Sequence, residues 1–226
     1  PEEHGRLQDA GRELDAIASR YLDVGAIVDI AAKAEPFDAP DSDPWATAAA
    51  APGGEVTVGV FKDSAFTFYY PENLEALERA GATLAYESAI EDSSLPDMDA
   101  LVIGGGFPET HAARLAGNES LRASVREAAA RGMPIYAECG GLMYLCRSMS
   151  WGGTTYPMAG VIDAEASMHG RPVGHGYVEA VVDGPNPFLD PGTRILGHEF
   201  HYSSIERAGQ SMATAYSVNR GSGAVG

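Results

Sequence analysis

The chain has 226 residues, of which 45% are hydrophobic, and its formal net charge is -17 because 15 Lys and Arg stand against 32 Asp and Glu. This length and apolar content fit one sizeable α/β domain with an appendage, and they exclude a disordered or fibrous chain. The acidic excess excludes a surface for nucleic-acid phosphates, which requires positive charge.

The cysteine count and the hydropathy pattern narrow the class further. The two cysteines, Cys139 and Cys146, are too few for a disulfide framework or a zinc cluster. No apolar run approaches the ~20 residues that cross a bilayer, and the first ten residues lack the features of a signal peptide. We therefore expect a cytoplasmic protein with no metal site in this region and no membrane contact.

The first 54 residues differ in pattern from the rest. Apolar residues recur at spacings of three and four, which predicts an amphipathic helix; they are Leu7, Ala10, Leu14, Ile17 and Tyr21. We interpret residues 1–37 as the C-terminal remnant of a preceding domain, although the pattern fits equally a helix that packs on the following domain. Residues 38–54 are rich in Pro, Asp, Ala and Gly, which is typical of a linker.

Residues 55–226 form the predicted main domain. The expected strands are 56–60, 82–86, 101–103 and 133–137, and the expected helices begin at 71, 108 and 120. Strands that alternate with helices predict an α/β fold with a doubly wound, mostly parallel sheet. Beyond Trp151 the helical patterns thin out, and β-like stretches cover 160–168, 176–182 and 195–203.

Cys139 lies between a predicted strand and a predicted helix and is followed by Gly140 and Gly141. This arrangement resembles a nucleophile elbow, in which the sulfur is exposed beside a helix N-terminus whose dipole is expected to lower the thiol pKa. A buried, unreactive cysteine is the commoner case, but the glycine-flanked turn favours a nucleophile. Cys146 is predicted to lie within the same helix and to serve packing.

Three glycines, Gly104, Gly105 and Gly106, follow another predicted strand; we call them the glycine loop. Glycines let backbone N–H groups approach a developing oxyanion closely. A phosphate loop is a weaker interpretation because no Lys and Ser or Thr follow the glycines. A purely structural turn is the remaining alternative.

Two histidines compete for the role of the base that a cysteine nucleophile requires. His198 and His201 lie about 60 residues beyond Cys139, an arrangement in which folding brings the base to the nucleophile. On a strand their side chains point to opposite faces, and the pattern does not decide between them. The other histidines are expected to be structural, with substrate contact open for His169 and His175.

Five segments together resemble the class I glutamine amidotransferases and, more narrowly, the cobyrinic acid a,c-diamide synthase family: 63–73, 104–109, 138–144, 176–180 and 197–203. The resemblance implies that Cys139 attacks the amide of glutamine. His201 is the implied base because the family's catalytic histidine follows a phenylalanine. Gly105, Gly106 and Gly140 are the implied oxyanion-binding and glutamine-binding residues.

The resemblance also implies the function of a longer protein. Such a protein is a glutamine-dependent amidoligase in cobalamin biosynthesis, in which ammonia passes to an N-terminal synthetase domain. There ATP and Mg²⁺ would activate the a and c carboxylates of a corrinoid, so no cofactor is expected in the glutamine domain itself. Alternatives are a related tetrapyrrole substrate (hydrogenobyrinate or nickel sirohydrochlorin), a non-catalytic regulatory domain, or a cysteine peptidase on a similar sheet.

Two positions depart from the general amidotransferase pattern. Ser203 stands where many relatives have a glutamate that orients the histidine, and Glu199, on the same strand face as His201, is a candidate for that role. Met143 stands where relatives often have a glutamine that holds substrate. Tyr144 and the residues near Phe107 are candidates for the lost contact.

Overall fold

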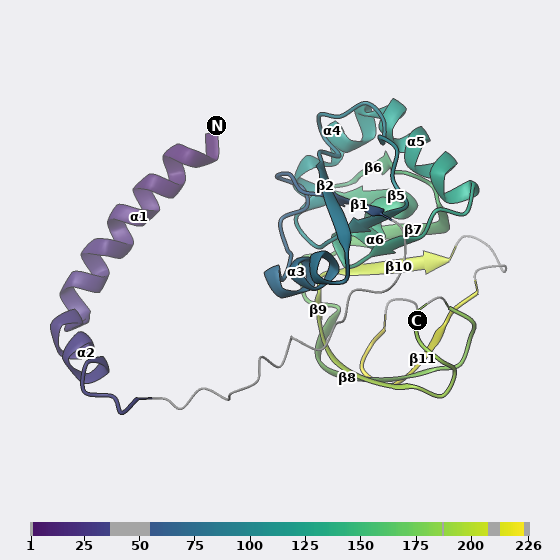
Figure 1. Ribbon diagram of the computed structural model, residues 1–226. Helices are drawn as coiled ribbons and strands as arrows, with labels where there is room; N and C mark the ends of the chain where they lie inside the picture. Colours follow the sequence, from purple (N-terminus) through teal and green to yellow (C-terminus); the bar gives the residue numbers. More distant parts are fainter. Residues whose placement is uncertain (1, 37–54, 187, 208–212, 224–226) are drawn as a thin grey trace. The chain divides into compact units, whose positions relative to one another are not determined.

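The computed structural model describes residues 2–36, 55–186, 188–207 and 213–223, with side chains from residue 10 onward (Figure 1). The chain divides into two compact units, Pro1–Ala46 and Thr47–Gly226. The predicted linker, 38–54, lies outside the described residues.

The first unit contains two helices, α1 (Glu2–Tyr21) and α2 (Val24–Ala31). The predicted N-terminal helix is thus confirmed, and α2 is an addition. Asp23 caps α2 by accepting a hydrogen bond of 2.9 Å from the Ala26 N–H, as expected for an N-cap side chain. α2 is almost entirely apolar, so it has no polar face from which a helical period could be read.

The second unit is built around a four-stranded parallel sheet. Its strands are β1 (Val56–Phe61), β2 (Ala82–Glu87), β3 (Ala100–Ile103) and β4 (Ile135–Ala137), in the order β2-β1-β3-β4. The predicted α/β fold with a mostly parallel sheet is therefore confirmed. All four strands were expected, and β1 was expected from a β-branched run that is typical of a buried parallel strand.

The helices of this unit also follow the predicted order. α3 (Pro71–Arg79) begins with a proline at its first position, where the missing N–H is not needed. The helix predicted from residue 108 is a short 3₁₀ turn, η1 (Pro108–His111), followed by α4 (Ala112–Gly117). Asn118 then caps α5 (Glu119–Ala130) and also donates to the carbonyl oxygens of Ala89 and Asp92.

The C-terminal part of the unit forms two further sheets. The first, in the order β10-β7-β5-β6, contains β5 (Cys146–Trp151), β6 (Thr154–Pro157), β7 (Ile162–Met168) and β10 (Ser203–Arg207). The second, β11-β8-β9, is antiparallel and contains β8 (Gly174–Val182), β9 (Arg194–His201) and β11 (Tyr216–Arg220). The expected β-rich character beyond Trp151 is confirmed, and β5, β6, β10 and β11 are additional strands.

Cys146 does not lie in a helix, contrary to the prediction. Helix α6 (Gly140–Leu145) ends one residue earlier, and Cys146 has extended backbone angles and begins β5. The alternation of residues 147–151 fits a strand, and pairing with β6 and β7 stabilises it. The side chain is fully buried and its thiol donates to the Leu142 carbonyl at 3.3 Å, so the packing role is confirmed.

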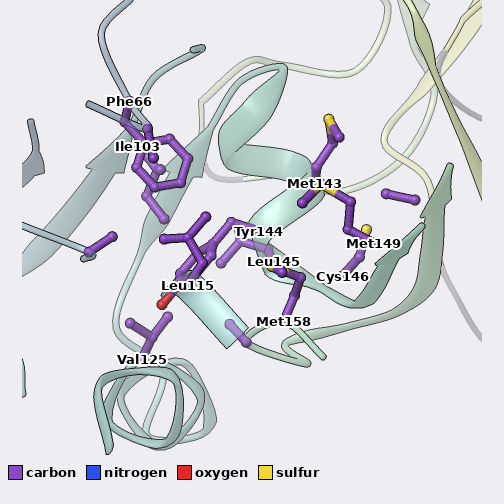
Figure 2. Close-up of a cluster of buried hydrophobic side chains, with 14 of the residues drawn as sticks. Phe66, Ile103, Leu115, Val125, Met143, Tyr144, Leu145, Cys146, Met149 and Met158 are labelled. Carbon is purple, nitrogen blue, oxygen red and sulfur yellow. The ribbon is translucent and has the colours of Figure 1, made fainter. Parts of the chain in front are cut away.

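The buried core joins the parallel sheet, α4 to α6 and the strands that follow α6. Figure 2 shows Tyr144 and Leu145 of α6 among side chains from other elements. The largest buried residues include Phe61, Phe66, Leu101, Ile103, Leu115, Leu121, Tyr144, Met149 and Met158. Because α6 is anchored in this core, the turn immediately before it is held firmly.

No helix within the described ranges has the length and apolar content needed to span a membrane.

Candidate active site

Cys139 occupies a sharp turn between β4 and α6. Its backbone angles are φ 50° and ψ -109°, and it is the one non-glycine residue with positive φ in the described part of the chain. Such a conformation costs about 1–3 kcal/mol and persists only where the surroundings enforce it. The predicted sharp turn between strand and helix is therefore present. Cys139 is exposed as a residue, although neighbouring atoms partly bury its sulfur.

Main-chain hydrogen bonds enforce this turn. The Gly141 N–H lies 2.8 Å from the Glu138 carbonyl and 3.1 Å from the Gly104 carbonyl, and the Glu138 N–H donates to Ile103 at 3.0 Å. A Cβ at Gly141 would lie 2.4 Å from the Ile103 carbonyl oxygen. The turn therefore requires glycine at position 141 and is tied directly to the end of β3.

The glycine loop lies beside the nucleophile. A Cβ at Gly105 would be 3.5 Å from the Cys139 Cβ and 3.9 Å from its sulfur. A Cβ at Gly140 would be 3.3 Å from the Gly106 nitrogen. Gly105 also forms an isolated antiparallel bridge with Phe68. The structure thus brings Gly105, Gly106 and Gly140 close to Cys139.

Segment 65–69 packs against the glycine loop and is hydrogen-bonded to it. The Phe68 N–H donates to Gly105 and the Phe107 N–H donates to Ala65, each at 2.9 Å. The Tyr69 hydroxyl accepts from the Gly104 N–H at 2.9 Å and donates to the Phe61 carbonyl. These contacts fix the position of the loop relative to β1.

Asp63 anchors this supporting segment at the end of β1. One carboxylate oxygen accepts from the N–H groups of Ala65 and Phe66, at 2.8 and 3.1 Å. The other accepts from the Ser88 hydroxyl and the Ile90 N–H, both at 3.1 Å. Asp63 and Tyr69 belong to a segment that the sequence singled out, but no motif showed that they support the glycine loop.

The thiol of Cys139 is less acidic than predicted. Burial of the sulfur raises the Cys139 pKa above its ordinary value, the facing Gly140 N–H lowers it, and the carboxylates of Glu109 and Glu138 raise it further. The expected lowering by a helix dipole is therefore wrong. α6 has only six residues, and two nearby negative charges oppose thiolate formation. A thiol in this state requires a base.

His201 lies at the end of β9 and is enclosed by polar groups. Its Nδ1 is 2.8 Å from the Ser203 carbonyl oxygen, and its Nε2 is 3.4 Å from Oε2 of Glu199. No hydrogen bond joins it to Cys139 in the part of the chain that the structure describes. Glu199 does contact His201, as the strand alternation suggested, and Ser203 contributes its backbone rather than its side chain.

The remaining histidines occupy other surroundings. His198 lies opposite Tyr177, and its ring is 6.1 Å from that of His175, whose ring is in turn 5.5 Å from that of Phe200. His169 contacts the Ser204 hydroxyl at 2.8 Å through Nε2. His198 thus lies on the face of β9 opposite His201, as alternation predicts.

The residues considered for the missing contact with glutamine differ in their exposure to solvent. Met143 and Tyr144 are buried in the core (Figure 2), so neither faces the thiol. Phe107 is exposed, follows the glycine loop and contacts the ring of Phe68 at 5.9 Å. Tyr144 is thereby ruled out as a substrate contact in this structure.

A cavity of about 70 Å³ lies on the α3 side of the glycine loop, and Gly104, Tyr136 and Glu138 are among its lining residues. Its lining includes neither Cys139 nor His201. Among the described residues, no group of three or more His, Cys, Asp or Glu side chains is arranged to hold a metal ion.

Comparison with known proteins adds to this geometry. Residues 57–226 match the CobB/CobQ-like glutamine amidotransferase domain. The chain is 43% identical to the cobyrinate a,c-diamide synthase of Magnetococcus marinus, over 97% of this chain and 47% of that protein. It is 38% identical to the enzyme of the same name from Methanosarcina acetivorans, over 98% and 47%. The chain therefore spans about half the length of these curated relatives.

A solved structure, PurLQS from Thermotoga maritima, superimposes with a TM-score of 0.52 at 15% identity, covering 74% of this chain and 76% of that one. At this identity the likeness concerns the fold alone. The matched domain and the extended identity to the two relatives show that the chain belongs to the CobB/CobQ-like glutamine amidotransferase family.

Proposed function

We propose that this domain hydrolyses glutamine at Cys139, with His201 as the base, and supplies ammonia to the synthetase part of a longer enzyme. The observation that carries the proposal is the enforced positive-φ turn at Cys139, which lies beside the backbone of Gly105 and Gly106. A costly backbone conformation at a reactive side chain supports a catalytic role.

The steps follow from the residues present. His201 takes the thiol proton as the sulfur forms a bond to the amide carbon of glutamine, and the N–H groups of Gly105 and Gly106 stabilise the resulting oxyanion. The C–N bond breaks and ammonia leaves with the proton from His201. Water then attacks the thioester, which releases glutamate and restores the thiol.

Two features of the site bear on the first step. The raised pKa of Cys139 supports a mechanism in which a base removes the proton during attack, rather than one that starts from a stable thiolate. His201 must approach the sulfur for this step, and catalytic hydrogen bonds are often long before substrate binds.

For the longer protein, we propose amidation of the a and c carboxylates of cobyrinate, the reaction that the relatives' name describes. We assign residues 1–37 to the end of the synthetase domain and the ATP- and Mg²⁺-dependent step to the remainder of that domain.

Glutamate release tests the proposal. The full-length protein and its Cys139→Ala and His201→Ala variants are assayed with glutamine, with and without ATP and cobyrinate. Loss of release in both variants is expected; release that is independent of Cys139 would overturn the glutaminase assignment. Amide formation on cobyrinate, compared with hydrogenobyrinate and nickel sirohydrochlorin, tests the substrate separately.

A further inference from the structure

The cavity beside the glycine loop has an apolar interior and an open aromatic rim. Among its lining residues, Leu74 is buried and Leu77 and Val102 are half-buried, whereas Phe68 and Tyr70 are 65% and 72% exposed. Its volume is about 70 Å³, while pockets that enclose drug-sized ligands measure ~300–1,000 Å³. The cavity therefore has room for a single side chain but not for a corrinoid.

Glu138 gives the rim of this cavity a negative charge. Its carboxylate accepts a hydrogen bond from the Tyr136 hydroxyl, and both residues line the cavity. Burial, this hydrogen bond and the Glu138 charge all raise the pKa of Tyr136, so the phenol keeps its proton. The lining residues include no Lys, Arg or His, and no ion pair within the described ranges involves Glu138. The described part of the chain thus supplies no cation to balance this carboxylate.

The cavity adjoins the backbone that positions the proposed nucleophile. Glu138 directly precedes Cys139, and its carbonyl oxygen accepts from the Gly141 N–H at 2.8 Å. Gly104, the first residue of the glycine loop, also lines the cavity. A group bound there therefore contacts both the turn at Cys139 and the glycine loop without occupying the place of the reacting atoms.

Segment 63–73 contributes exposed side chains to the rim. It is one of the five segments that resemble the cobyrinic acid a,c-diamide synthase family, yet the proposed catalytic steps use none of its exposed side chains. Phe68, Tyr70 and Asn73 are exposed and line the cavity. Exposed aromatic rings around a small pocket are typical of protein interfaces, where an anchoring side chain fills such a pocket.

We propose that the cavity receives a lysine or arginine side chain from the synthetase part of the longer protein. The alkyl stem of that side chain lies against Leu74, Leu77 and Val102, and its cationic head pairs with Glu138 beside the aromatic rim. The present chain covers 47% of its curated relatives, so about half of the longer protein can supply the side chain. The inference rests on the proposed function, in which the synthetase part receives the ammonia.

This contact links docking of the synthetase part to the state of the thiol. Burial, the Glu109 carboxylate and the Glu138 carboxylate raise the pKa of Cys139, and the Gly140 N–H lowers it. A cation next to Glu138 offsets the smallest of the three raising effects, and so it lowers the pKa of the thiol. The nucleophile is thereby favoured when the part of the enzyme that uses ammonia is in place.

Photo-crosslinking in the full-length enzyme tests the contact. A benzophenone-bearing amino acid replaces Tyr70 or, as the matched control, Tyr86, which is 52% exposed and does not line the cavity. Irradiation of the Tyr70 variant is expected to join it to a peptide of the synthetase part that contains a Lys or Arg, and the Tyr86 variant should not yield that peptide. A crosslink to a second copy only, or none to the synthetase part, would overturn the proposal.

Charge reversal tests the cation. In the crosslinking protein, Glu138→Lys and the cavity-filling Leu77→Trp are each expected to reduce the crosslink yield at least about five-fold, because a like charge or a bulky ring opposes entry of the cationic side chain. Glu78→Lys reverses an exposed charge that does not line the cavity and should leave the yield unchanged. An equal yield in Glu138→Lys and Glu78→Lys would refute the ion pair, and this comparison still holds if Leu77→Trp does not fold.

The alkylation of Cys139 tests the link to the thiol. Replacement of the crosslinked Lys or Arg by Ala should raise the midpoint pH of peptide-resolved alkylation by iodoacetamide; an unchanged midpoint would refute that link. Neither measurement requires glutamine hydrolysis. A retained crosslink without Cys139-dependent glutamate release would contradict the proposed function alone, whereas a missing crosslink in an enzyme that hydrolyses glutamine would overturn this inference alone.

Discussion

Main-chain hydrogen bonds fix the positions of Cys139 and the glycine loop. By contrast, the position of His201 is fixed by contacts of its imidazole ring with neighbouring groups. The turn at Cys139 is tied to β3 through the carbonyl groups of Ile103 and Gly104. His201 depends on one carbonyl group, the carboxylate of Glu199 and the space left by Gly174. The surroundings of Cys139, the proposed nucleophile, are therefore fixed by backbone geometry. Those of His201, the proposed base, are fixed by groups that single substitutions can remove.

The largest expected effect separates the two cysteines. Cys139→Ala should lower glutamate release by about 10³-fold or more, because it removes the proposed nucleophile. Cys146→Ala removes a buried sulfur outside the site and should leave release within a few-fold of wild type while lowering the unfolding midpoint. Equal losses of activity in the two variants would contradict the assignment.

Substitutions in the glycine loop test its rigidity. A Cβ at Gly106 would lie 2.1 Å from the Ala65 carbonyl oxygen, so Gly106→Ala must move the loop. We expect kcat to fall by about 10²- to 10³-fold, as when an oxyanion donor is lost. A Cβ at Gly105 meets no atom closer than 3.3 Å, so Gly105→Ala should cost less; the reverse order of kcat values would contradict the geometry.

Substitutions of two glycines on the paired strands β8 and β9 test how His201 is positioned. Gly174→Ala would place a Cβ 2.2 Å from Nε2 of His201, whereas a Cβ at Gly197 meets nothing within 4 Å. We expect Gly174→Ala to lower kcat roughly 10- to 100-fold by displacing the ring and Gly197→Ala to have little effect. Steady-state kinetics of both variants, with circular dichroism as a folding control, gives the comparison.

The pH dependence of thiol alkylation measures the charge around the nucleophile. Because the Glu109 carboxylate raises the Cys139 pKa, Glu109→Gln should lower that pKa. At a pH below the midpoint the variant then contains more thiolate and should react faster with iodoacetamide. Peptide-resolved alkylation rates between pH 6 and pH 10 give the two midpoints, and a midpoint that rises or stays constant in the variant would refute the role of Glu109.

The smallest expected effect is on stability and concerns Tyr69, which is hydrogen-bonded to the glycine loop. The Tyr69 hydroxyl joins the Gly104 N–H to the Phe61 carbonyl, and burial raises the Tyr69 pKa to about 12. Tyr69→Phe should lower the free energy of unfolding by about 1–3 kcal/mol, because two buried polar groups lose their partner. Tyr70→Phe, at a residue that is 72% exposed, is the control in urea unfolding, where equal stabilities would contradict this role.

The two halves of the site also differ in how far the sequence predicts them. The elbow and the glycine loop could be predicted because close backbone approach leaves a visible signal, which is a run of glycines directly after a predicted strand. The parallel sheet could be predicted from its β-branched strands. Neither prediction required knowledge of distant contacts.

The surroundings of His201 could not be predicted from local sequence patterns. Alternation along β9 separated His198 from His201 but did not select one of them. The contact between Glu199 and residues 222–223 joins positions more than twenty apart, and β11 had no recognisable pattern. The thiol pKa was wrongly predicted because burial of the sulfur and the approach of the Glu109 carboxylate, which raise that pKa, arise only in the folded chain.

The most direct test of the central claim is the mass of the protein after treatment with an electrophilic glutamine analogue, such as a diazoketone. The account predicts a single covalent addition that maps to Cys139, is prevented by excess glutamine and is absent from Cys139→Ala. An addition at Cys146 or at any other residue, or no addition protected by glutamine in the full-length enzyme, would contradict it.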